Sequence, residues 1–60
     1  MTWDEFDYMA QVVIDSLDEF DGYAMHIAIS AFGYNKETID TVLYTMFGMG
    51  LENYFSQLEG

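Results

Sequence analysis

The chain contains no cysteine, no proline and no arginine, and Lys36 is its only permanently basic side chain. Without cysteine, neither a disulfide framework nor a thiolate zinc site is available. With one lysine the chain cannot neutralise several phosphates, so we expect no direct binding of nucleic acid. No apolar run approaches the ~20 residues of a membrane span. The N-terminus also lacks the positive segment of a secretory signal, so we expect a cytoplasmic protein that does not bind membranes.

Acidic side chains are abundant: eleven in sixty residues give a formal net charge of −10. Such a field repels anionic surfaces and attracts basic protein surfaces. The chain is not expected to be a disordered acidic tail, because 52% of its residues are apolar and 18% are aromatic. Its length predicts a single domain over 1–60 with a small core. So small a core leaves apolar surface uncovered, which is compatible with a homodimer or with a monomer bearing an exposed patch.

Hydrophobic spacing and turn residues predict an all-α fold, a compact bundle of three to four short helices. The first helix should begin at a Thr2/Glu5 capping box and end near Gly22. Its apolar residues recur every three or four positions and predict one core-facing stripe. That stripe consists of Trp3, Phe6, Ala10, Val13, Leu17 and Phe20.

The remaining segments predict three further helices. Residues 23–32 are apolar nearly all round, which predicts a central helix buried on most sides. Asn35 is a good N-cap for the next helix, and Gly48 and Gly50 should end it. A short last helix should cover about 51–58. The inner faces expected of the last two helices comprise Ile39, Val42, Leu43, Met46, Phe47, Leu51, Tyr54, Phe55 and Leu58.

The candidate binding residues gather near the N-terminus. On one continuous helix, Asp4, Asp7, Asp15 and Asp18 would fall within about 80° of surface, opposite the core. Their axial steps of about 4.5–6 Å are close to the spacing of phosphates along a nucleic-acid strand. Tyr8 would flank this stripe, either as a contact for a partner or packed on another helix. The predicted partner-binding residues are Asp4, Glu5, Asp7, Tyr8, Asp15, Asp18, Glu19 and Asp21.

Catalysis finds little support in the sequence. His26 lies in an apolar segment without metal-ligand spacing around it, so we expect a core or interface histidine rather than a catalytic base. The serines have no glycine elbow, and there is no glycine-rich phosphate cradle. We therefore expect a protein that is not an enzyme and that needs neither metal nor cofactor.

Composition and the aspartate stripe together resemble those of small acidic phage-encoded antagonists, such as anti-CRISPR and other anti-defence proteins. The resemblance implies an inhibitor that places carboxylates where a nucleic-acid-binding protein expects phosphates, in the cytoplasm of the host cell. Residues 24–58 also resemble the three-helix ubiquitin-associated (UBA-like) layout. That second resemblance depends on Phe32-Gly33-Tyr34 in the position of its first loop and on Met49-Gly50-Leu51 before the last helix.

Two functional hypotheses follow. The first is a non-enzymatic acidic protein that inhibits a basic nucleic-acid-binding protein by occupying its groove. The alternative is a helical interaction or self-associating adaptor module that acts through its apolar and aromatic surface. The side chains expected to grip the partner in the second case are Tyr34, Tyr44, Met49 and Tyr54.

Overall fold

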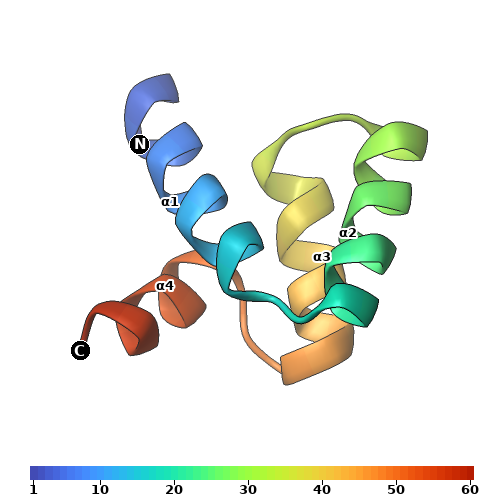
Figure 1. The fold of residues 1–60 in the computed structure, drawn as a ribbon. Coiled ribbons are helices and arrows are strands. Elements are labelled where there is room, and N and C mark those ends of the chain that lie inside the picture. The colour runs from blue at the N-terminus through green and yellow to red at the C-terminus, as the bar shows by residue number, and fades with distance from the viewer.

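Four helices and no strand make up the computed structural model, which describes all of residues 1–60. They are α1 (Trp3–Ser16), α2 (Glu19–Phe32), α3 (Lys36–Phe47) and α4 (Leu51–Glu59). In Figure 1, α2 and α3 lie side by side, and α4 lies against α1. The prediction of an all-α bundle is confirmed. None of the four helices has both the length and the apolar character that crossing a membrane requires.

Side-chain caps and glycines determine most helix boundaries, as predicted. The Thr2 hydroxyl accepts a hydrogen bond from the Glu5 amide at 3.2 Å, and Asn35 Oδ1 accepts one from the Thr38 amide at 2.9 Å. These caps satisfy donors that have no partner within the first helical turn. Gly48 ends α3 with a φ of 76°, in the left-handed region that other residues adopt at a cost.

The predicted end of the first helix is wrong. The chain leaves the helix after Ser16, and Leu17 is extended with φ −73° and ψ 148°. Asp18 then starts α2, because its Oδ1 accepts a hydrogen bond from the Asp21 amide at 2.7 Å. Gly22, predicted to end the first helix, therefore lies inside the first turns of α2. This break divides the predicted aspartate stripe between two elements.

The predicted central position of the second helix is also wrong. Only Met25 of α2 is buried, while Phe20 is 81% and Phe32 77% exposed. The reason is that α2 lies at the edge of the bundle (Figure 1), so α3 covers one side and no fifth helix covers the other. Phe20 and Trp3, both expected in the core, are exposed. His26, expected in the core or an interface, is also exposed in the single chain.

The core draws on all four helices. It consists of Phe6, Ala10, Val13, Met25, Ile39, Leu43 and Leu51. The predicted inner faces of α1 and α3 are thus confirmed at their centres, and Leu51 brings α4 to the same cluster. Of the predicted α4 contacts, Leu58 is exposed because it lies in the last turn of the helix, beyond the core.

The start of α4 is capped from another helix. Gly50, its N-cap residue, has no side chain that can accept a hydrogen bond. Asp40 of α3 supplies the missing acceptor, because its Oδ1 lies 2.7 Å from the Leu51 amide. A Cβ at position 50 would lie 3.0 Å from that same oxygen, so glycine is what lets the carboxylate approach. This bond couples the direction of α4 to α3.

Candidate protein-binding surface

The three aspartates of α1 lie on one face of the helix. Asp4, Asp7 and Asp15 fall at i, i+3 and i+11, with Gln11 between them, so they share about 80° of helix surface. The helix rises about 16 Å from Asp4 to Asp15. Asp4 and Asp15 are exposed, and Glu5 lies exposed beside Asp4 in the first turn.

Asp7 differs from its neighbours because it serves the fold. The Tyr34 hydroxyl donates to Asp7 Oδ1 at 2.7 Å and accepts from Gln11 Nε2 at 3.4 Å. Desolvation first, and then the hydrogen bond to Asp7, raise the pKa of Tyr34 above its ordinary value. The tyrosine ring also packs edge-on against Trp3 and lies 5.2 Å from the Phe6 ring. Asp7 thus anchors the α2–α3 turn on α1, and it is half-buried beneath Tyr34 rather than fully exposed like Asp4 and Asp15.

A second group of carboxylates surrounds the α1–α2 turn. We call it the acidic turn; its members are Asp15, Asp18, Glu19 and Asp21. Asp18 uses one oxygen to cap α2, whereas Asp15 and Glu19 are exposed and make no side-chain hydrogen bond. Asp21 is half-buried. The predicted residues are therefore close together, although Asp18 belongs to the turn and not to the α1 face.

The only lysine pairs with carboxylates outside this group. Lys36 Nζ lies 2.6 Å from Asp40 Oδ2 and 3.6 Å from Glu52 Oε1, at the junction of α3 and α4. The hydrogen bond to Asp40 is the main cause that raises the pKa of Lys36. No ion pair reaches any of the seven carboxylates between Asp4 and Asp21. Their negative charge is therefore uncompensated within the chain.

Tyr8 combines the two roles that the sequence left open. Its side chain is 60% exposed, yet its ring meets that of Phe55 edge-on, with 5.8 Å between the centroids. The contact joins α1 to α4 and leaves the rest of the ring in solvent. Tyr8 is thus both a packing residue and an accessible aromatic side chain near Asp4 and Glu5.

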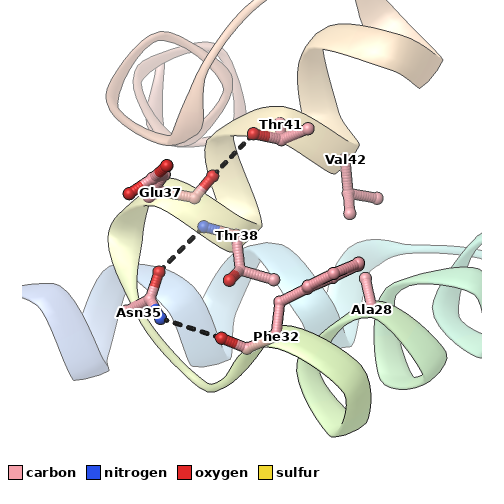
Figure 2. Close-up of a pocket in the computed structure, with 7 residues that line it drawn as sticks. All are labelled: Ala28, Phe32, Asn35, Glu37, Thr38, Thr41 and Val42. Atoms are coloured by element: carbon pink, nitrogen blue, oxygen red, sulfur yellow. Dashed lines mark hydrogen bonds between the residues drawn. The ribbon is translucent and has the colours of Figure 1, made fainter.

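A shallow groove of about 420 Å³ runs between α2 and α3. Figure 2 shows its lining residues, Ala28, Phe32, Asn35, Glu37, Thr38, Thr41 and Val42. Their polar groups are largely used internally: Asn35 bonds the Thr38 amide, and the Thr41 hydroxyl donates to the Glu37 carbonyl at 2.8 Å. What the groove offers is the exposed Phe32 ring beside one carboxylate. Its lining residues do not combine a nucleophile, a general base and oxyanion donors in the way that catalytic sites do.

No three histidine, aspartate or glutamate side chains converge closely enough to hold a metal ion.

One surface was not predicted from the sequence, the exposed apolar side of α2 around Phe20, Tyr23 and Ile27. The signal was present, because a helix that is apolar all round must expose part of that surface when too few helices surround it.

Comparisons with protein families, curated proteins and solved structures found nothing that matches this chain. The functional argument therefore rests on the chemistry of the surface.

Proposed function

We propose that this chain is a non-enzymatic acidic binding protein that occupies the basic groove of a nucleic-acid-binding protein and so competes with nucleic acid. The observation that carries the proposal is the uncompensated charge of the N-terminal third. Seven carboxylates lie between Asp4 and Asp21, and the one lysine pairs with Asp40 and Glu52 instead. A structural surface would gain from lysines at i,i+4 beside these acids, and it has none.

The geometry divides the carboxylates by role. Asp4, Glu5, Asp15 and Glu19 are exposed and make no side-chain bond, so they are the main phosphate substitutes. Asp7 and Asp18 each hold a bond within the fold and would contribute mostly through their charge. Because the attraction is electrostatic, affinity for a basic partner should fall as salt rises.

A pair of matched charge variants tests the proposal. The first carries Asp4→Asn, Asp15→Asn and Glu19→Gln; the control carries Glu37→Gln, Glu52→Gln and Glu59→Gln. Both lose three charges, but only the first loses them at the proposed surface. Proteins captured by the wild-type chain are released with a salt gradient and with an excess of single- or double-stranded DNA. With each exposed contact worth up to about 0.5 kcal/mol, the first variant should bind about tenfold more weakly than the control.

Equal loss of binding in the two variants would contradict the proposed site, because only net charge would then matter. Binding that withstands molar salt, or that DNA does not displace, would contradict the proposed competition.

A second candidate function is a helical interaction module that acts through apolar contacts. The exposed aromatic side chains of α2 favour it, since contiguous apolar patches of a few hundred square ångströms mark interaction sites. Of the residues that the sequence suggested as partner contacts, Tyr34 is hydrogen-bonded to Asp7, and the Tyr54 ring packs at a tilt against Phe47 with 4.8 Å between the ring centroids. Only Tyr44 among the suggested aromatics is strongly exposed. A module of this kind would bind through α2 rather than through those residues.

A further inference from the structure

One side of α2 is apolar and faces solvent along three turns of the helix. We call it the α2 outer face; it consists of Phe20, Tyr23, Ala24, Ile27 and Ala31. Phe20 is 81%, Tyr23 67% and Ile27 50% exposed. At about 100° per residue, Phe20, Ile27 and the two alanines fall within about 60°, and Tyr23 lies at one edge. The opposite side of α2 holds Met25 in the core.

The α2 outer face is also free of charge. No aspartate, glutamate, lysine or arginine occurs in residues 22–35, although the chain has eleven acids. A basic groove would therefore gain nothing electrostatic from this surface. Its complement is a neutral, apolar surface, and the chain itself carries one.

The area available matches a small dimer interface. If an aromatic side chain contributes about 200 Å², Phe20 and Tyr23 together expose about 300 Å², and Ile27 with the alanines brings this to about 400 Å². Homodimer interfaces are about 65% apolar, so the whole contact would cover about 600 Å² per copy. The resulting total of about 1,200 Å² is at the lower limit for specific interfaces.

When two copies of α2 run antiparallel, the large side chains of one copy lie opposite small side chains of the other. With the two-fold axis midway between Met25 and His26, Phe20 of one copy lies opposite Ala31 of the other. Ala24 then lies opposite Ile27 in the same way. Each large side chain meets an alanine, which lets the two helices approach closely. We propose that the α2 outer face binds a second copy of this chain in this antiparallel arrangement.

The antiparallel direction also separates like charges. Glu19 would be level, along the helix axis, with residue 32 of the second copy, although neither residue belongs to the α2 outer face, so the two Glu19 carboxylates would be about 20 Å apart along the helices. That exceeds the Debye length of about 8 Å at physiological salt. A parallel pair would place the two acidic turns side by side. The dimer goes beyond the acidic-groove proposal and does not depend on it.

Sedimentation equilibrium over about 10 to 500 µM tests the dimer, because interfaces of this size bind in the micromolar range or more weakly. The two matched variants are Phe20→Ser and Phe32→Ser, which change the same residue type on the same helix. Both side chains are highly exposed, but Phe32 points into the α2–α3 groove (Figure 2) and away from the α2 outer face. We expect Phe20→Ser to weaken dimerisation at least about tenfold and Phe32→Ser to leave it unchanged, with equal helicity by circular dichroism.

The antiparallel register has its own test. Ala31→Phe should weaken the dimer, because the new ring meets Phe20 of the second copy. Adding Phe20→Ala to Ala31→Phe restores one large and one small side chain at each contact and should restore the dimer. Dimerisation should also strengthen as salt rises, since the two chains are both strongly negative. This is opposite to the salt effect expected for a basic partner, so failure of one proposal is distinguishable from failure of the other.

A wild-type chain that stays monomeric throughout this range would overturn the dimer and leave the α2 outer face to a different protein. Equal effects of Phe20→Ser and Phe32→Ser would overturn the choice of face. A double variant that remains as weak as Ala31→Phe alone would overturn the antiparallel register.

Discussion

Replacing Asp40 by alanine should destabilise the fold more than any other single removal of a carboxylate. One oxygen of Asp40 caps α4 through the Leu51 amide at 2.7 Å, and the other binds Lys36 Nζ at 2.6 Å. Leu51 and Gly50 are both buried, so water has poor access to the amide once its acceptor is gone. The variant therefore leaves a donor without a partner, and that loss is what makes the substitution costly.

The magnitude follows from the two bonds. Loss of a helix cap costs about 1 kcal/mol, and poor access of water raises this to about 1.5 kcal/mol. The exposed i,i+4 pair with Lys36 adds about 0.4 kcal/mol. The total of about 2 kcal/mol should lower the melting temperature by about 8–16 °C in a domain of this size. Asp40→Asn keeps an acceptor oxygen and should lose about half as much.

Urea denaturation followed by circular dichroism at 222 nm measures the effect, with Glu52→Gln as the control. Glu52 touches Lys36 only at 3.6 Å and has an exposed side chain, so its replacement should cost less than about 0.5 kcal/mol. If Asp40→Ala unfolds at the same urea concentration as Glu52→Gln, the inter-helix cap contributes nothing and the reasoning is wrong. Gly50→Ala supplies a second check, because its Cβ would crowd the same Asp40 oxygen.

Two further predictions concern charge. Asp15 lies in the last turn of α1, where a basic side chain would interact favourably with the helix dipole and none is present. Asp15→Lys should therefore stabilise the fold by about 0.5 kcal/mol and weaken binding to a basic partner; a lower melting temperature would contradict this. The pKa of Tyr34 and that of Lys36 are raised in the fold, so folding favours their protonated forms. The stability that these two groups contribute should therefore be fully present below about pH 10 and should be lost as pH rises through their pKa values in the folded chain. Tyr34→Phe should lose less stability between pH 8 and 11 than the wild type, and a urea midpoint that falls more steeply in the variant would refute this.

Local side-chain chemistry made much of the fold predictable. Thr2 and Asn35 cap their helices as their positions indicated, and Gly48 ends α3. The break after Ser16 was not predicted, because the helical spacing of apolar residues continues through Leu17 and Phe20 although the helix ends before them. Asp18 and Asp21 carried an N-cap signal, but Gly22 beside them equally indicated a helix end. Hydrophobic periodicity cannot decide between a helix that ends at Gly22 and one that begins at Asp18. The folded chain shows the second, with Leu17 extended and Asp18 capping α2.

The candidate surface was predictable in composition and only partly in geometry. That the N-terminal acids lack a cation follows from the sequence, since there is one lysine. That Asp7 holds Tyr34 could not be predicted, because the two residues are 27 positions apart and meet only in the folded chain. The exposure of Phe20 could not be predicted for a similar reason. Composition shows how apolar a helix is, but which of its sides is buried depends on where the neighbouring helices lie in the fold.

The position of Lys36 has a practical consequence for anyone handling this protein. Trypsin, which cleaves after lysine and arginine, has a single possible site here, between α3's first two residues. In the folded chain that peptide bond lies within a capped helical turn, and the lysine head group is held by Asp40. Cleavage therefore requires that α3 open, and it separates α1 and α2 from most of α3 and α4. The rate at which one intact band becomes two fragments thus reports the opening of this small bundle without any label.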